Sequence, residues 1–353
     1  MTQAITRNRR TFLQTLAMVG IGSQTLLRTG NVKAAVAEAQ GRVEGGLGWP
    51  EMAYRTLGRT GFKGSRLVFG CGASLARRTR DELLNVAFDA GVNVFDIGMG
   101  RYYGDAERNM AGFLKRKRDD IFLISKASVT FGGDDPVGPH DEISVGQGKD
   151  AAAGWLAILE ESLRDLDVDT IDAYYQMGAN NPNLIANEEM RMAFERARDA
   201  GKIKHWGVST HENAEAVLAK AVETGWYDLA MIAITPAGWY DWKGRSIVEG
   251  SPPMTEIQPT LEKAKASGMG LIGMKAARYI AGRNFLGWGD DSAFDEHYDE
   301  AVLRSKLTSF QRSYAFVLEH GVDAVNADIQ NFLHLRENFA AAATSHEYFA
   351  NTA

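Results

Sequence analysis

Short apolar runs alternate with amphipathic stretches along most of this chain, beginning near residue 65. The apolar runs have the length and the β-branched or aromatic content of buried strands, and they cover residues 66–70, 92–97, 121–125, 171–176, 203–208, 229–234, 270–274 and 324–327. Helical periodicity fills the intervals, at 80–90, 106–117, 151–166, 188–200, 214–224, 257–267 and 306–319, and a last helical stretch follows at 333–343. Gly91, Gly201, Gly225 and Gly268 stand where helices should end. Eight strand–helix units in succession predict a (β/α)8 barrel.

Two connections in this pattern, at 128–150 and 236–256, are longer than ordinary loops. Both follow a strand, so in a barrel of this kind they lie at the carboxyl end of the strands, and we expect them to cover a substrate. The second contains Trp239, Tyr240 and Trp242. These aromatic rings either stack on a ligand or only pack the loop down, and we assign Trp239 to the substrate pocket.

The first 37 residues do not continue the pattern. Arg9 and Arg10 precede Thr-Phe-Leu-Gln and an apolar segment that runs to residue 27, and Ala-Val-Ala at 35–37 offers a small-residue cleavage site. This stretch is typical of a twin-arginine export signal, and the alternative is a basic amphipathic start to a cytoplasmic protein. The sequence therefore predicts a signal peptide at 1–37, a Gly-rich linker at 38–53, and export of the folded protein to the periplasm by the twin-arginine machinery.

Composition narrows the function classes. The chain has 353 residues, 24% charged and 45% hydrophobic, which is ordinary for a globular protein. A net charge of −6 argues against a nucleic-acid partner, and the apolar N-terminal segment, interrupted by Gly20 and Gly22, is too short for a stable membrane anchor. Cys71 is the one cysteine, which excludes an intramolecular disulfide and a cysteine-ligated iron–sulfur cluster; no zinc-like spacing of Cys and His occurs, so no metal is expected.

Two charged residues mark the ends of the second and third predicted strands. Asp96 lies at the carboxyl end of the 92–97 run, and Lys126 directly follows the 121–125 run. Because parallel strands of one barrel end at the same face, both side chains should project into one mouth. A Tyr-Tyr-Gly loop at 102–104 arrives at the same end. The cluster is either a structural ion pair beside a loop tyrosine, or a proton donor in which the carboxylate fixes an ammonium that lowers the pKa of a tyrosine.

This arrangement resembles the aldo-keto reductase family, which carries Asp near the end of strand 2, Tyr in a following Tyr-Gly loop and Lys at the end of strand 3. The stretch YRTLGRTGFKGSRLVFGCG (54–72) is similar to the family's opening hairpin and first strand, GKIKHWGVST (201–210) to its strand 5, and RENFAAA (336–342) to its last helix. The resemblance implies an α/β fold, a (β/α)8 TIM barrel of aldo-keto reductase type with an N-terminal β-hairpin, over residues 54–345.

The resemblance also implies residue roles. Tyr103, Gly104 and Glu107 fit the family's Tyr-Gly-x-x-Glu pattern, so Tyr103 is the expected general acid, with Lys126 tuning its pKa and Asp96 anchoring the lysine. The family's strand 4 histidine falls on Met177, in the substrate pocket. A thioether cannot donate a hydrogen bond, so it cannot polarise a carbonyl as an imidazole does.

The cofactor implied by the resemblance is NADP or NAD. Its expected ligands are Ser209, which matches the serine after strand 5, Lys275 and Arg278 after strand 7, and Asn338, which matches the adenine-side asparagine. Lys275 and Arg278 are otherwise solvated surface charges. The family pattern is lost at Thr210, Met231 and Ile234, and Asp328 stands where a glycine is usual and would repel a phosphate.

The predicted function is therefore an exported NAD(P)-dependent oxidoreductase that interconverts a small-molecule carbonyl and an alcohol. Two alternatives stay open at this point. One is a periplasmic binding protein or pseudoenzyme that keeps the barrel without the cofactor. The other is a cofactor-independent lyase or isomerase that uses the same tyrosine and lysine. Fold class does not choose among them.

Overall fold

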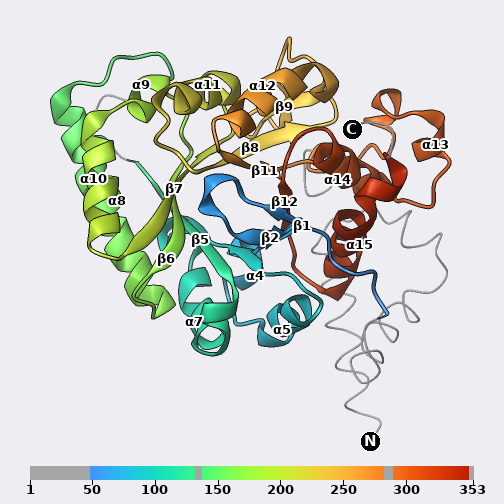
Figure 1. The fold of residues 1–353 in the computed structure, drawn as a ribbon, viewed down its shortest axis with the longest axis horizontal. Helices are drawn as coiled ribbons and strands as arrows, with labels where there is room; N and C mark the ends of the chain where they lie inside the picture. Colours follow the sequence, from blue (N-terminus) through green and yellow to red (C-terminus); the bar gives the residue numbers. More distant parts are fainter. Residues whose placement is uncertain (1–47, 130, 132–136, 282–288, 350–353) are drawn as a thin grey trace, which may run out of the picture.

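Eight parallel strands close into a ring at the centre of the molecule (Figure 1). Their order is β3-β4-β5-β6-β7-β8-β11-β12, and β12 pairs back with β3. The strands are β3 (Leu67–Gly70), β4 (Val94–Asp96), β5 (Phe122–Ser128), β6 (Ile171–Met177), β7 (Ile203–Thr210), β8 (Leu229–Thr235), β11 (Gly270–Met274) and β12 (Ala324–Asp328). This computed structural model describes residues 48–129, 131, 137–281 and 289–349; the predicted signal at 1–37 lies outside the described residues.

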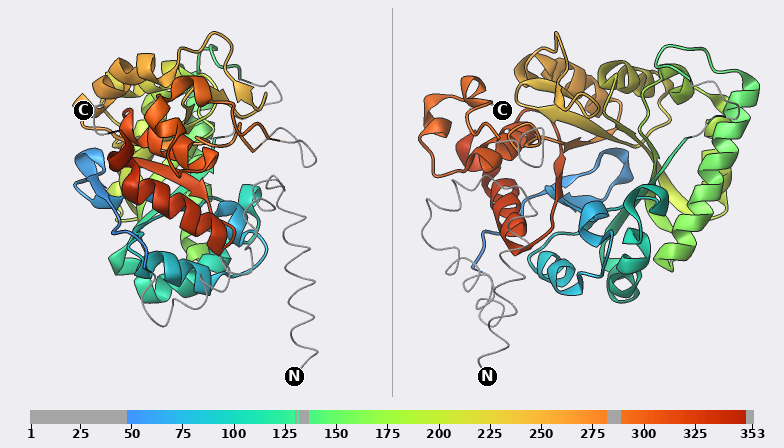
Figure 2. Two further views of the ribbon diagram at one scale, coloured as in Figure 1. Left: turned by 90° about the vertical axis from the view of Figure 1, so that its right-hand side faces the viewer. Right: turned by 180° about the vertical axis from the view of Figure 1, so that it is seen from behind.

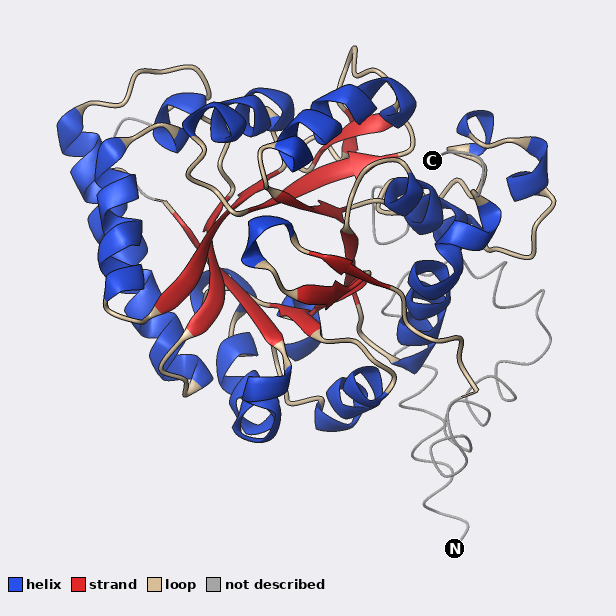
Figure 3. Ribbon diagram, viewed as in Figure 1, coloured by secondary structure: helices blue, strands red, loops and turns tan. Residues whose placement is uncertain are grey.

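Helices surround this ring and cover its outer face (Figure 3). The longer ones are α5 (Asp81–Asp89), α7 (Ala106–Lys117), α8 (Val145–Leu166), α10 (Glu188–Asp199), α11 (Ala214–Thr224), α12 (Met254–Ala266), α14 (Ser309–Glu319) and α15 (Phe332–Tyr348). In the side view of Figure 2, α14 and α15 pack together on the flank that faces the viewer. The (β/α)8 barrel predicted from the alternating pattern is confirmed.

Side-chain alternation divides the apolar residues into two layers, as the two-residue period of a strand requires. Val94, Ile124, Tyr175 and Ile272 belong to a buried cluster inside the barrel. Their sequence neighbours, such as Phe95 and Tyr174, belong to the larger cluster between the strands and the helices. The inner faces are thus filled with side chains, and the space for a ligand lies at the mouth of the barrel.

A β-hairpin closes the amino end of the barrel. Strands β1 (Tyr54–Thr56) and β2 (Lys63–Ser65) pair antiparallel and lie across the middle of the ring in Figure 1. Between them Leu57 is fully buried in the inner cluster. Gly58 has a φ of +51°, and a Cβ there would lie 2.2 Å from the backbone nitrogen of Gly270, so only glycine fits. The N-terminal hairpin predicted by the resemblance is therefore the floor of the barrel.

The element boundaries follow local signals, and the four predicted helix-ending glycines all have positive φ. Helix α8 begins at Val145, six residues before the predicted start. Ser144 is its N-cap, and it forms a capping box with Gln147.

The long connection after β8 holds a second hairpin, β9 (Gly238–Asp241) with β10 (Ser246–Ile247), which extends the ladder of β8.

The folded part of the chain extends slightly beyond the bounds predicted for the barrel, 54–345. Met52 is buried in the outer cluster, and the ring of Trp49 lies 4.9 Å from that of Phe339, so the end of the predicted linker belongs to the fold. Helix α15 continues to Tyr348. Within the described residues, no helix combines the length and the apolar character needed to cross a membrane.

Candidate active site at the barrel mouth

Asp96 and Lys126 form a buried ion pair at the carboxyl ends of β4 and β5. Lys126 Nζ lies 2.5 Å from Asp96 Oδ1 and 2.6 Å from Oδ2. Asp96 is 5% exposed and Lys126 is 3% exposed. Asp96 is two residues beyond Val94, and Lys126 is two residues beyond Ile124. Val94 and Ile124 belong to the inner cluster, so the two charged side chains share their inward face and project into the barrel. The structure therefore brings these two predicted residues together.

Asn326 is a further hydrogen-bond partner of the Asp96 carboxylate, and the sequence analysis did not predict it. Its Nδ2 lies 2.6 Å from Asp96 Oδ2 and 3.3 Å from the sulfur of Met231. Asn326 is two residues after Ala324, which belongs to the inner cluster, so it lies on the inward face of β12. A polar residue at an inward position of a predicted strand was the signal in the sequence that could have identified it.

Tyr103 lies beside Lys126 at the mouth of the barrel. It ends the short helix α6 (Gly100–Tyr103), and its ring occupies the space that two glycines leave open. A Cβ at Gly72 would lie 2.4 Å from Tyr103 Cε1. A Cβ at Gly98 would lie 2.9 Å from Tyr103 Cε2 and 3.0 Å from Lys126 Cγ. Tyr102, in contrast, is 55% exposed, so Tyr103 is the tyrosine that the fold brings to the ion pair.

The electrostatics of Tyr103 differ from the expectation that Lys126 lowers its pKa. Burial, followed by the charges of Asp96, Tyr102 and Asp328, raises the pKa of Tyr103 well above its ordinary value. Asp96 lies against the ammonium of Lys126 through both carboxylate oxygens, which neutralises the charge that was expected to act on the phenol. The hydroxyl is therefore protonated at neutral pH, as a proton donor requires.

Glu107 anchors the segment that presents Tyr103. Its carboxyl group is 1% exposed and accepts a hydrogen bond of 2.7 Å from the hydroxyl of Ser125, the residue before Lys126. Burial raises the pKa of Glu107, and hydrogen bonds from Ser125 and Ser162 act in the opposite direction. The contact fixes the start of α7 to strand β5, which holds the preceding Tyr103 loop in register with Lys126.

Strands β6 and β7 bring Met177 and Ser209 next to each other. The two residues are partners in the ladder, and Ser209 is 2% exposed. Trp206 and Val208 belong to the outer cluster, so Ser209 lies on the inward face of β7. Met177 ends β6 half-buried and packs against the outer cluster. The structure thus places Ser209 at the mouth, and Met177 at its rim.

A cationic cluster forms the opposite side of the mouth. Lys275 Nζ lies 4.0 Å above the ring centroid of Trp242, and the guanidinium of Arg278 lies 5.8 Å from it. Burial lowers the pKa of Lys275 to about 8, a shift that the charge of Asp328 partly offsets and that of Lys126 increases. Lys275 and Arg278 therefore come together over Trp242, and their role as cofactor ligands stays a prediction.

His211 belongs to the same cluster and was missed in the sequence. Its ring centroid lies 6.1 Å from that of Trp242. Burial, then the charges of Lys275 and Lys126, lowers the pKa of His211 to about 3. A histidine two residues beyond Ser209, and therefore on the same face of the chain, was the signal available.

Trp239 and Asn338 lie away from the mouth, whereas Asp328 ends β12. Trp239 is 4% exposed and sits in the outer cluster, so it does not face the inside of the barrel as its assignment to the substrate pocket requires. Its neighbour Tyr240 is buried in the inner cluster, and Trp242 packs against that cluster. Asn338 is buried in α15, apart from the described contacts of the mouth. Asp328 is exposed at the end of β12 and accepts a hydrogen bond of 2.8 Å from Gln330.

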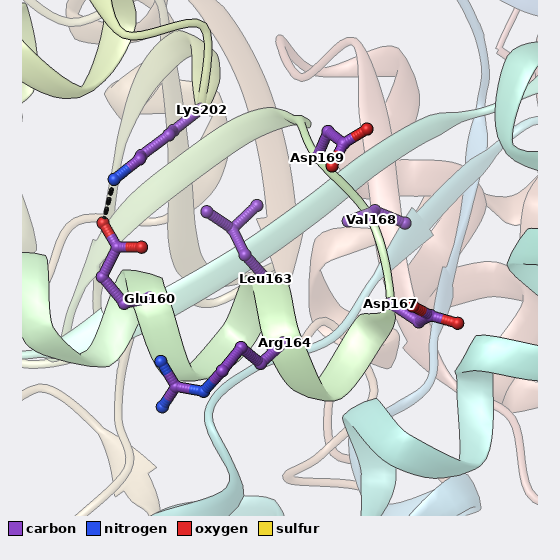
Figure 4. A pocket seen from close by; sticks show the side chains of 7 residues that line it. All are labelled: Glu160, Leu163, Arg164, Asp167, Val168, Asp169 and Lys202. Atoms are coloured by element: carbon purple, nitrogen blue, oxygen red, sulfur yellow. Dashed lines mark hydrogen bonds and ion pairs between the residues drawn. The ribbon is translucent and has the colours of Figure 1, made fainter.

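A hollow of about 520 Å³ lies between the end of α8, the loop that follows it, and Lys202 just before β7 (Figure 4). It is lined by Glu160, Leu163, Arg164, Asp167, Val168, Asp169 and Lys202. Lys202 forms an ion pair with Glu160, and Lys115 Nζ lies 2.8 Å from Asp167. These residues precede β6 and β7, whereas Asp96 and Lys126 stand at strand ends. The described part of the chain holds no cluster of three or more His, Cys, Asp or Glu suited to a metal ion.

Comparison with known proteins places this geometry in context. The model of the aldo/keto reductase family matches residues 58–274. A curated protein named "Probable voltage-gated potassium channel subunit beta", from Oryza sativa subsp. japonica, is 31% identical over 166 residues, and the match covers 45% of this chain and 46% of that protein. The chain therefore spans about half the length of this relative.

Solved structures show the same fold at low identity. An aldo-keto reductase from Bacillus halodurans, in its holo form, has a TM-score of 0.59 and 20% identity, with 86% of this chain and 96% of that chain covered. An aldo-keto reductase from Klebsiella pneumoniae in complex with NADPH has a TM-score of 0.58 and 18% identity, with 82% and 90% covered. At these identities the likeness establishes the fold alone.

Proposed function

Because this chain belongs to the aldo/keto reductase family, we propose that it is an NAD(P)-dependent oxidoreductase that interconverts a carbonyl and an alcohol. The observation that supports this proposal is the position of Tyr103, which shares the space above Gly98 with the stem of Lys126. A buried, protonated phenol at the open end of a barrel, next to a fixed ion pair, is suited to give a proton to an oxygen atom that enters the mouth.

When bound, a reduced nicotinamide would supply the hydride that adds to the carbonyl carbon. Tyr103 donates its proton to the carbonyl oxygen, so that the alcohol forms and the tyrosine is left as a phenolate. Lys126 Nζ has one N–H beyond the two directed at Asp96, and this N–H can stabilise the phenolate until solvent returns the proton. Asp96, held by Asn326, keeps the ammonium in place.

The residues present fit a nicotinamide dinucleotide. Lys275 and Arg278 offer positive charge for phosphate groups, and Lys275 makes no hydrogen bond or ion pair within the described part of the chain. Ser209 has a hydroxyl on the inward face of β7 for a polar group of the nicotinamide. Burial of a lysine without a paired anion is costly, which favours an anionic ligand at this position.

Fluorescence titration of the purified protein with NADPH and with NADH tests the cofactor, and reduction of simple aldehydes tests the activity. We expect saturable binding by at least one cofactor, and turnover that falls about 100- to 10,000-fold in Tyr103→Phe, because that substitution removes the proton and little volume. Tyr102→Phe is the matched control and should keep wild-type turnover. Activity that survives in Tyr103→Phe but is lost in Tyr102→Phe would move the role by one residue.

One observation favours a second candidate, a barrel that binds a ligand without turnover. Met177 stands at the rim of the mouth and cannot donate a hydrogen bond to a carbonyl. A protein that binds neither cofactor in the titration, but remains folded, would support this pseudoenzyme or a cofactor-independent lyase or isomerase that uses Tyr103 and Lys126.

We also propose that the N-terminal residues direct export of the folded protein to the periplasm. The supporting feature is the pair Arg9 and Arg10 ahead of a short apolar segment. A nicotinamide cofactor would then have to be bound before transport, which this export route allows because its cargo is folded. Replacing Arg9 and Arg10 by Lys should leave the precursor in the cytoplasm. Periplasmic accumulation of that variant would contradict the proposal.

A further inference from the structure

His211 has an unusual position for an imidazole that no part of the predicted mechanism uses. It follows Thr210, the last residue of β7, and lies two residues beyond the inward-facing Ser209. The inward direction of this face of β7 is visible at Gly207, where a Cβ would lie 2.2 Å from the ring of Tyr175 inside the barrel. Continued alternation therefore turns His211 toward the mouth.

The contact with Trp242 places the His211 ring beside the cationic cluster of the mouth. Lys126 on β5 and Lys275 after β11 both lower its pKa, and β7 stands between those two strands in the ring, with one strand separating it from each. Lys275 lies against the same Trp242 ring, which agrees with this position.

His211 is a neutral hydrogen-bonding group and not a cation. Burial and the two lysines keep the imidazole neutral at physiological pH, so it carries one N–H donor and one acceptor nitrogen. Within the described part of the chain neither ring nitrogen has a hydrogen-bond partner. A half-buried donor without a partner at the mouth is available to a ligand.

We propose that His211 is a second catalytic hydrogen-bond donor, which contacts the carbonyl oxygen of the substrate together with Tyr103. This inference rests on the proposed reductase function. The imidazole N–H polarises the carbonyl and stabilises the negative charge that develops on oxygen as the hydride arrives, while the proton that is transferred still comes from Tyr103. Met177 offers no donor on the neighbouring strand, so His211 supplies this contact from β7.

Two substitutions of His211 distinguish hydrogen bonding to the substrate from packing against Trp242. His211→Phe keeps an aromatic ring against Trp242 and removes the N–H, whereas His211→Gln keeps an N–H donor. His346→Phe, at an exposed position of α15, is the matched control. We expect kcat for aldehyde reduction to fall about 100- to 1000-fold in His211→Phe, with the NADPH Kd within about two-fold of wild type. His211→Gln should retain kcat within about ten-fold of wild type.

The possible results are distinguishable. Wild-type kcat in His211→Phe, or equal losses in His211→Phe and His211→Gln, would overturn the inference while leaving the reductase function standing. A wild-type protein that binds NADPH but reduces no aldehyde would refute the proposed function itself, and the role of His211 would fall with it. Circular dichroism of both variants establishes that each loss occurs in a folded barrel.

Discussion

Asn326 and Lys126 approach the same oxygen atom of Asp96. Asn326 Nδ2 and Lys126 Nζ each lie 2.6 Å from Asp96 Oδ2, although they come from strands on opposite sides of β4 in the ring. The carboxylate is thereby held from β12 as well as from β5. This arrangement makes the orientation of the active-site ion pair depend on a residue that touches neither the proposed proton donor nor the proposed cofactor ligands.

We predict that Asn326→Ala destabilises the protein by about 1–3 kcal/mol, because it removes a hydrogen bond to a buried carboxylate. Chemical denaturation in urea measures the change. Asn183→Ala is a suitable control, since its side chain donates to the carbonyl of Asp141 at the surface and its loss should cost less than about 0.5 kcal/mol. Equal stability of Asn326→Ala and wild type would show that Lys126 alone fixes Asp96.

Gly72 sets the position of the Tyr103 ring. A Cβ at Gly72 would lie 2.4 Å from Tyr103 Cε1, so Gly72→Ala must displace the phenol. We expect kcat to fall by at least about 100-fold, since proton transfer requires close positioning, while cofactor affinity is retained. Gly112→Ala in α7 is the control, because its nearest neighbour lies 3.9 Å from the added carbon. Full activity in Gly72→Ala would mean that Tyr103 can move without loss of function.

Lys275 predicts a pH dependence of cofactor affinity. Its pKa is lowered by burial to about 8, so the ammonium that attracts phosphate is lost as pH rises through about 8, or somewhat higher once an anion is bound. The NADPH Kd should therefore increase between about pH 7 and pH 9.5 in the wild type. Lys275→Met should bind weakly and without this dependence. Lys149→Met, at an exposed position, should behave as the wild type does.

Deprotonation of Lys275 weakens cofactor binding but stabilises the folded protein. The folded protein holds the Lys275 proton less tightly than the unfolded chain does, so its buried charge destabilises the fold below about pH 8. This cost decreases as pH rises from about 8 towards the ordinary lysine pKa. Lys275→Met should accordingly be more stable than wild type near neutral pH in the absence of ligand. A stability gap of unchanged size at high pH would contradict this account.

Asp328 predicts a preference between cofactors. Asp328 lies two residues beyond the inward-facing Asn326, so it is on the mouth side of β12, where its charge raises the pKa values of Lys275 and Tyr103. A 2′-phosphate carries close to two negative charges, so NADPH should be disfavoured more than NADH. We expect Asp328→Asn to improve NADPH affinity more than NADH affinity, as measured by titrating both cofactors into both proteins. Tight NADPH binding that the substitution leaves unchanged would show that the 2′-phosphate binds elsewhere.

The barrel and its ion pair were predictable because they depend on local patterns. Each strand is buried on both faces, which produces the apolar runs, and the glycines that end the helices have the left-handed backbone that other residues avoid. Asp96 and Lys126 could be paired because parallel strands end at one face. The start of α8 lies before the predicted position because the capping box of Ser144 and Gln147 begins the helix ahead of its apolar periodicity.

The rest of the site depends on contacts that sequence spacing does not contain. Which aromatic residue of the β9 hairpin faces the mouth depends on its register with β8, which places Trp239 in the outer cluster and Tyr240 inside. The pKa of Tyr103 depends on how completely Asp96 neutralises Lys126. Asn326 reaches Asp96, and His211 reaches Trp242, only when the ring closes.

The hairpin that seals the barrel floor has a consequence for the order of folding. Arg59 donates hydrogen bonds to the backbone carbonyls of Gly225 and Ser267, which are 166 and 208 residues further along the chain. Contacts of such long sequence separation form slowly, because a large loop must be closed before they contribute. During synthesis the hairpin is made before the ring that it closes, and its neighbour Gly270 is added only about 200 residues later. Leu57 reaches its buried position only after the strands of the inner cluster are in place, so we expect its burial to follow closure of the barrel.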